Sequence, residues 1–142
     1  MNVLFISNDL IAGDLAYLIK KDGHNVKFYI ENEQQRGNFH NLIDKTTDWH
    51  QELDWVGKDG LIVFDDVGYG KIQDELRAQG YSVFGGSKLG DKLETDREHA
   101  QEIFEQHDIK TVPIKNFKNI LDATNFIKEN GGSWVIKQNG HA

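Results

Sequence analysis

Residues 59–88 read DGLIVFDDVGYGKIQDELRAQGYSVFGGSK, and the order of elements in this stretch decides the fold. The apolar run 61–64 stands between a glycine and two aspartates, which is typical of a short strand buried on both faces. Residues 71–79 have apolar side chains at helical spacing, and Gly80 follows as a stop signal. A second short apolar run, 81–84, comes next. Strand, helix and strand in this order predict a βαβ unit of a parallel sheet.

The N-terminal part of the chain repeats this pattern. A strand is expected at 2–6, a helix at 12–21 and a second strand at 25–30, which together predict a Rossmann-like α/β fold. A dinucleotide-binding fingerprint would place the glycines of G-x-G-x-x-G directly after the first strand. Residues 7–13 read SNDLIAG, with one glycine, so the sequence argues against NAD binding.

Composition narrows the class of protein further. The chain has 142 residues, a net charge of −7 and no cysteine. This acidic balance argues against a nucleic-acid surface, and the absence of cysteine excludes a disulfide framework and a thiolate metal site. No run is long and apolar enough to span a membrane, and the six histidines are scattered, so no zinc site is expected. These features predict a cytoplasmic protein that binds small molecules.

The remaining expected elements are read from apolar spacing and stop signals. The helix 12–21 is expected to turn Leu15, Leu18 and Ile19 inward. Trp49 and Trp55, two of the three tryptophans, are expected to pack in or beside the core. The other expected elements are a short helix at 39–43, a helix at 95–107 with Thr95 as its cap, a strand at 112–115, a helix at 119–129 and a strand at 133–138.

Ligands of parallel sheets bind beyond the carboxyl ends of the strands, so polar residues at those ends are candidates. Asp65 and Asp66 follow the strand 61–64 and could bind a cation, an amine or ribose hydroxyls, or could simply cap the next helix. The Gly85-Gly86-Ser87-Lys88 turn could hold a phosphate at a helix N-terminus, or could be a plain connection with Ser87 as the cap. Both alternatives stay open for each segment. For Asp65 itself, a purely structural role in the loop is favoured over a role in binding.

Lys137 lies in the expected last strand among apolar residues. A lysine is costly to bury without a partner, and an anionic phosphate would provide one. Lys137 is therefore a candidate phosphate contact.

The region 81–113 resembles the ATP-grasp ligases, and within them the phosphoribosylamine–glycine ligases. These ligases have a strand that ends in F-G, then S-K, a short helix with L-E, a helix that opens on a lysine, and an I-P-T-like turn. The residues that carry the resemblance are Phe84-Gly85, Ser87-Lys88, Leu93-Glu94, Arg97 in place of the lysine, and Ile109 to Pro113. Residues 131–142, GGSWVIKQNGHA, are similar to the family's V-K strand and a following D-G-like turn.

The resemblance implies a two-part organisation. Residues 1–90 would be the Rossmann-like pre-ATP-grasp domain, and residues 91–142 the beginning of an ATP-grasp domain. The longer protein would join a carboxylate to an amine with ATP and Mg²⁺, as in purine biosynthesis. The chain ends before the family's glycine-rich phosphate loop, so we expect this chain alone to be inactive and to bind no cofactor tightly.

The resemblance also assigns expected site residues. Lys137 and Arg97 would contact ATP, and no residue would act as a catalytic acid or base. The family's glycine-rich first turn and a later glutamate face its substrate, and the corresponding expected contacts here are Ser7, Asn8 and Asp66. Gly85 and Ser87, from the 85–88 turn, are expected substrate contacts as well.

Two other functions fit parts of the sequence. A stand-alone Rossmann-like binding or interaction module would explain the altered first turn and the missing phosphate loop. A receiver-like signalling domain would use aspartates at strand ends and a late lysine, but its order of elements after Pro113 would differ from the one expected here. Continuation of the natural reading frame into a glycine-rich loop would favour the ligase.

Overall fold

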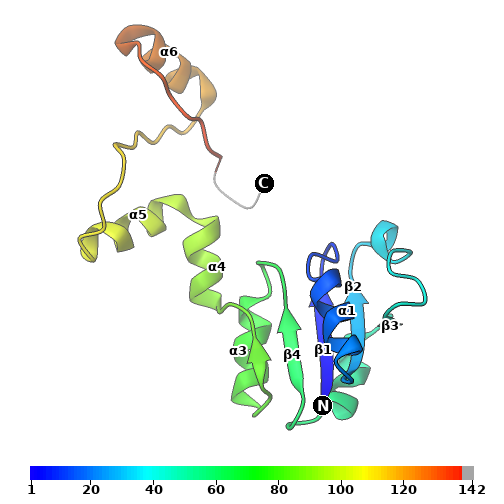
Figure 1. Cartoon of the computed structure of the whole chain (residues 1–142). Helices are drawn as coiled ribbons and strands as arrows, with labels where there is room; N and C mark the ends of the chain where they lie inside the picture. The colour runs from blue at the N-terminus through cyan, green and yellow to red at the C-terminus, as the bar shows by residue number, and fades with distance from the viewer. Residues whose placement is uncertain (139–142) are drawn as a thin grey trace. The chain divides into compact units, whose positions relative to one another are not determined.

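The computed structural model describes residues 1–138, and the D-G-like turn expected at 139–142 lies outside them. The chain divides into two compact units, 1–91 and 92–142, and each is described by itself. The first unit holds a five-stranded parallel sheet in the order β3-β2-β1-β4-β5, visible in Figure 1. Its strands are β1 (Asn2–Ser7), β2 (Asn25–Ile30), β3 (Asp44–Thr46), β4 (Leu61–Phe64) and β5 (Val83–Phe84). The predicted Rossmann-like α/β fold is confirmed.

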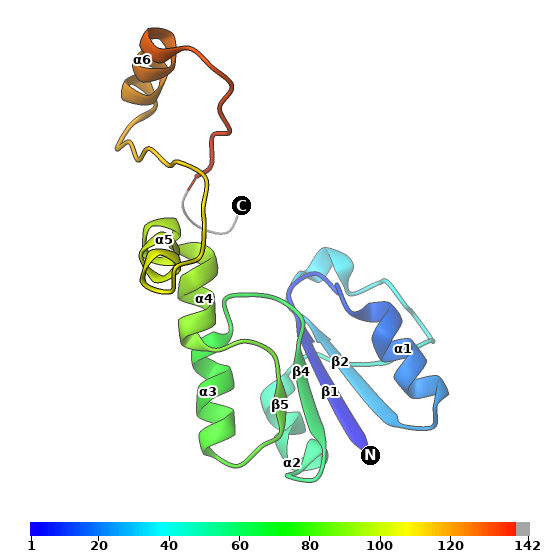
Figure 2. The same ribbon diagram turned by 60° about the vertical axis from the view of Figure 1, so that its left-hand side comes forward.

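Helices cover both faces of this sheet, as Figure 2 shows. On one face α1 (Gly13–Lys21) packs through Ala16 against Val3, Phe5 and Phe28. On the other face α2 (Leu53–Val56) and α3 (Gly70–Ala78) pack through Val56 and Leu76 against Leu4 and Ile6. Because β1 is central and buried on both sides, its apolar run is continuous rather than alternating. Trp49 is buried in the core under α2 and α3, and Trp55 packs beside this core, as predicted.

The inward face of α1 differs in part from the predicted one, because Ile19 packs against the core as predicted but the two leucines do not. Leu15 and Leu18 are exposed, whereas Gly13 and Ala16 are buried. A Cβ atom on Gly13 would lie 3.0 Å from the ring of Phe39, so the helix approaches its surroundings too closely for a large residue. Small residues therefore form the closest contacts, Tyr17 and Ile19 pack beside them, and two leucines remain outside.

The segment between β2 and α2 also differs from the expectation. No helix forms at 39–43; the segment contains the 3₁₀ helix η1 (Glu33–Gln35), a series of turns, and the edge strand β3. A second 3₁₀ helix, η2 (Trp49–Glu52), leads into α2. The strand β3 has the polar sequence Asp-Lys-Thr, so it gave no apolar pattern from which a strand could be predicted.

The second unit contains helices without a sheet among its described residues. Its helices are α5 (Arg97–Gln106) and α6 (Ile120–Asn130), and α4 (Lys88–Thr95) leads into it. The expected single helix 95–107 begins instead after Asp96, which has an extended backbone. The Asp96 side chain caps α5 by accepting the His99 N–H. No helix in the described residues has the length and apolar character needed to cross a bilayer.

The strands expected at 112–115 and 133–138 do not form in the structure. Val112, Val135 and Ile136 are exposed, with 76%, 81% and 63% of their surfaces accessible. A strand needs a hydrogen-bonded neighbour, and the described part of this unit gives neither segment one.

Candidate functional site

The carboxyl ends of the parallel strands lie along one edge of the sheet, and most of the predicted substrate contacts follow them. Ser7 ends β1 and pairs with Ile30 of β2, while Ile6 pairs with Phe64 of β4. The segments that leave this edge are 8–12, 31–32, 47–48, 65–69 and 85–87. The structure thus brings Ser7, Asn8 and Asp66 to neighbouring strand ends, in the position where parallel sheets bind ligands.

The loop after β1 is held by Ser7. This side chain is fully buried, and its Oγ accepts the N–H of Leu10 at 2.8 Å. Leu10 has a positive φ of 64°, which is uncommon for a residue with a branched side chain, and its carbonyl accepts the Gly13 N–H. The structure therefore gives Ser7 a role within the loop, and its predicted contact with substrate stays a prediction.

Asp65 links this loop to the end of β4. Its Oδ2 accepts the N–H of Ala12 at 2.7 Å, and its Oδ1 is buried without a hydrogen-bond partner among residues 1–138. Burial raises the pKa of this carboxyl, against the opposing effect of hydrogen bonds from Ser7 and Ala12. The nearby charge of Asp66 raises the pKa of Asp65 further.

Asp66 is half-buried beside Asp65, and its Oδ1 accepts the N–H of Val67 at 2.8 Å. The sequence placed Asp66 ahead of Asp65 as a functional residue, but the structure gives Asp65 the more central position between two loops. The feature of the sequence that indicated Asp65 was its position directly after a buried strand.

The end of β2 adds further polar groups to this edge. Asn32 donates from Nδ2 to Asp9 Oδ1 at 2.6 Å, and Asn8 donates to Asp9 Oδ2 at 2.8 Å. The Tyr69 hydroxyl donates to Glu31 Oε2 at 2.5 Å. Burial raises the pKa of Tyr69, and the Glu31 carboxylate raises it further. Asp9, Glu31, Asp65 and Asp66 give the edge a negative character, which suits an amine or hydroxyl groups better than an isolated anion.

The Gly85–Ser87 turn is held from α3. Arg77 donates to the carbonyls of Gly86 at 2.7 Å and of Gly85 at 3.2 Å. Ser87 Oγ accepts the N–H of Gly90 at 3.0 Å in the first turn of α4, so this serine has the geometry of a helix cap. Of the two alternatives left open by the sequence, the described contacts match the structural one.

A buried glutamine lies under this turn. Gln73 of α3 is fully buried, and neither of its amide atoms has a hydrogen-bond partner among the described residues. A Cβ atom on Gly85 would lie 2.3 Å from Gln73 Oε1, so only glycine fits above this side chain. No feature of the sequence indicated that Gln73 would be buried, because glutamines on helices are mostly exposed.

The predicted ATP contacts lie in the second unit. Arg97 donates from Nε to the carbonyl of Gln138 at 2.6 Å, which brings this arginine next to the segment that contains Lys137. Lys137 is exposed and does not lie in a strand, so it is not the buried strand lysine that the sequence predicted. Its contact with ATP stays a prediction. Among residues 1–138 no group of three or more His, Asp and Glu side chains is arranged to hold a metal ion.

Comparison with known proteins gives several sequence relatives that are named phosphoribosylamine–glycine ligase. The chain is 30% identical over 105 residues to phosphoribosylamine–glycine ligase of Neisseria meningitidis serogroup B, an alignment that covers 70% of this chain and 24% of that protein. It is 32% identical over 78 residues to the ligase of the same name from Streptococcus suis, covering 55% of this chain and 19% of that protein. A trifunctional purine biosynthetic protein of Chironomus tentans is 32% identical over 71 residues, half of this chain and 5% of that protein. No family model matches the chain.

Among solved structures, N5-carboxyaminoimidazole ribonucleotide synthetase of Thermotoga maritima has a similar fold. The TM-score is 0.61 at 15% identity, and the match covers 92% of this chain and 36% of that one. This likeness supports the fold alone. The chain spans about a quarter or less of the length of the ligases that it matches.

Proposed function

This chain is a relative of the phosphoribosylamine–glycine ligases, and on that basis we propose that it forms part of an ATP-grasp ligase that joins a carboxylate to an amine. The observation that carries the proposal is the 30% identity over 105 residues, which covers 70% of the chain. The names of the relatives support a role in purine biosynthesis. ATP with Mg²⁺ would be used by the longer protein.

In this proposal the first unit provides the amine site at the carboxyl edge of its sheet. The carboxylates of Asp65 and Asp66 and the amide of Asn8 lie at neighbouring strand ends. Their negative charge would favour a protonated amine or sugar hydroxyls through charge-assisted hydrogen bonds. Gly85 and Ser87 follow β5, at the far side of the same edge.

The second unit would contribute to ATP binding through Arg97 and Lys137. The bond from Arg97 to the Gln138 carbonyl brings Arg97 to the residue that follows Lys137. Two cationic side chains directed at the phosphates of a nucleotide would offset their negative charges. The exposed apolar residues of 112–136 would be covered by the rest of an ATP-grasp domain.

The reaction proposed for the longer protein has two steps. An oxygen of the carboxylate attacks the γ-phosphorus of ATP and ADP leaves, which forms an acylphosphate. The amine nitrogen then attacks the acyl carbon, and phosphate leaves with the oxygen that came from the carboxylate. This chemistry depends mainly on positioning and on the neutralisation of charge.

The proposal is tested with the natural protein that contains this chain. ADP release is measured with ATP, Mg²⁺, glycine and phosphoribosylamine, and each substrate is then left out in turn. ADP release that requires both the amine and the carboxylate supports a ligase. ADP release that does not depend on the amine contradicts the ligase proposal. The absence of any ADP release also contradicts it and favours a binding module without catalysis.

A further inference from the structure

Helix α1 carries apolar side chains on its outer side, away from the sheet that it covers (Figure 2). Leu15 and Leu18 lie on one face of the helix, with 49% and 55% of their surfaces accessible. Ile11, four positions before Leu15 in the turn that precedes the helix, is 64% accessible. Single exposed leucines are common, but a group at helical spacing is typical of a face that packs against a partner. We call these three residues the α1 stripe.

The stripe is separate from the contacts that hold α1 on the sheet. Gly13 and Ala16 are buried against the core, and Tyr17 and Ile19 pack beside them. The first unit therefore forms its core without the stripe. Substitutions in the stripe change the surface of the unit and leave its core contacts in place.

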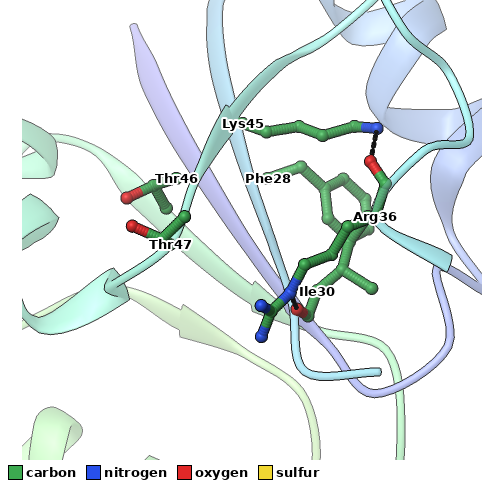
Figure 3. A pocket seen from close by; sticks show the side chains of 6 residues that line it. All are labelled: Phe28, Ile30, Arg36, Lys45, Thr46 and Thr47. Carbon is green, nitrogen blue, oxygen red and sulfur yellow. Dashed lines mark hydrogen bonds between the residues drawn. The ribbon is translucent and has the colours of Figure 1, made fainter. Parts of the chain in front are cut away.

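The concave surface beside β3 offers no comparable apolar contact. Its floor is formed by Phe28 and Ile30, which have 0% and 2% of their surfaces accessible. Figure 3 shows Lys45 and Arg36 on two sides of this floor, each donating to a backbone carbonyl. The apolar residues that line this surface are therefore already covered, unlike those of the α1 stripe.

The charges beside the stripe have opposite signs at its two ends. Asp14 lies in the first turn of α1 and Lys21 in its last turn, and both are exposed. They are seven positions apart, about two helical turns, so they lie on the same side of the stripe. Among residues 1–138, Asp14 has no hydrogen bond or ion pair, and the Lys21 ammonium contacts the Tyr17 ring at 5.9 Å from its centroid. Both charges are therefore accessible to a partner.

We propose that α1 pairs with α1 of a second copy of this chain in an antiparallel, two-fold symmetric contact. In this arrangement Asp14 of one copy faces Lys21 of the other, and the symmetry forms this ion pair twice. Leu15 and Leu18 lie between the two charges, so they pack against the same leucines of the second copy. A parallel arrangement would bring like charges together at both ends of the helix, so the charges select the antiparallel one.

The proposed dimer is weak, because a helix of nine residues offers a small contact. Interfaces that bury less than about 1,200 Å² in total form transient complexes. We expect a dissociation constant of about 0.1–1 mM, which NMR can measure. No residue of the α1 stripe belongs to the proposed amine or ATP sites, so the inference does not depend on the proposed ligase function and can fail separately from it.

NMR of the ¹⁵N-labelled chain over a wide range of protein concentration tests the inference. The amides of Leu15 and Leu18 should shift with the dependence of a monomer–dimer equilibrium. Leu18→Glu should weaken the dimer at least about tenfold, because apolar contacts are lost and carboxylates are brought together. Leu89→Glu is the matched control, since Leu89 is 71% accessible but lies in α4, and this variant should dimerise like the wild type.

Three outcomes of this experiment would overturn the inference. They are the absence of concentration-dependent shifts in the wild-type chain, shifts confined to helices other than α1, and normal dimerisation by Leu18→Glu. Each of them would leave the outer face of α1 to a different partner.

Exchange of the two charges tests the antiparallel pairing itself. Asp14→Lys and Lys21→Asp should each weaken the dimer about fivefold, because two attractive ion pairs become two repulsive ones. The double variant has both charges reversed, so it should regain the wild-type dissociation constant to within about twofold. A double variant whose NMR spectrum shows that it is folded, but which dimerises as weakly as the single variants, contradicts the pairing.

Discussion

Asp65 Oδ2 accepts the backbone N–H of Ala12 at 2.7 Å, and this bond joins the end of β4 to the loop that follows β1. The two residues are 53 positions apart in sequence. The carboxyl edge of the sheet is therefore held together by a partly buried acid, and the shape of the proposed amine site depends on it.

Asp65→Asn should keep the acceptor for Ala12 and remove a charge that is costly to bury. Burial raises the folded-state pKa of Asp65 above its ordinary 3.8. The folded state thus binds the proton of the Asp65 carboxyl more tightly than the unfolded state does. The stabilisation that protonated Asp65 gives the folded state is complete below pH 3.8 and is lost as the pH rises through the folded-state pKa. Relative to the wild type, the Asn variant should become more stable as the pH is raised from 3 to 7.

Urea denaturation of both proteins across this pH range measures the effect. Asp65→Ala serves as the comparison, because it leaves the Ala12 N–H without its acceptor and should cost about 1–3 kcal/mol. A wild type that gains stability relative to the Asn variant with rising pH would show that the charged form of Asp65 is favoured.

Gly70→Ala should destabilise the first unit. A Cβ atom at this position would lie 2.2 Å from the Ser87 carbonyl oxygen, so α3 or the turn before α4 must move, at a cost of about 1–3 kcal/mol. Gly90→Ala is the matched control, since its nearest neighbour would be Ser87 Oγ at 3.5 Å and alanine favours a helix interior by about 0.5–1 kcal/mol. Thermal melting that shows equal effects for the two variants would contradict the close contact.

The parts of the fold that could be predicted are those with a strong local pattern. The continuous apolar runs of β1 and β4 and the glycine stop after α3 predicted these elements correctly. The strand β3 could not be predicted, because it is three polar residues held at a sheet edge by its pairing with β2. The strands expected at 112–115 and 133–138 were wrong, because an apolar pattern gives a strand only where a partner strand is present.

The candidate site was predictable to the level of the sheet edge. Parallel topology alone places Asn8 and Asp66 at adjacent strand ends. The bond between Asp65 and Ala12 depends on the conformation of a loop in which Leu10 has a positive φ. Such a conformation is set by the loop as a whole, so no residue pattern indicates it.

Lys137→Ala should weaken ATP binding by the longer protein more than Arg97→Ala does. A charge-assisted bond from Lys137 to a phosphate would contribute about 1.5–3 kcal/mol. Arg97 already donates to the Gln138 carbonyl and lies between Asp96 and Glu98 in sequence, so its loss should remove about 0–1 kcal/mol. ATP titrations of both variants decide between them, and an equal or larger loss for Arg97 would place the phosphate contact there.

The 142-residue chain by itself should show no ATP-dependent ligation and should bind ATP more weakly than micromolar. It spans 24% of the length of the Neisseria ligase, and its described residues contain no group of three acidic or histidine side chains arranged for a metal ion. Calorimetry with ATP and Mg²⁺ measures the affinity. Micromolar binding by this chain would show that the contacts for the nucleotide are already complete within it.

The central claim is that the protein containing this chain activates a carboxylate with ATP. The most direct measurement uses glycine labelled with ¹⁸O in its carboxylate, together with phosphoribosylamine, ATP and Mg²⁺, and follows the label by mass spectrometry of the phosphate released. The account predicts one ¹⁸O atom in each phosphate formed in step with ADP, because the acylphosphate oxygen leaves with the phosphate. Unlabelled phosphate, or cleavage of ATP to AMP, would contradict it.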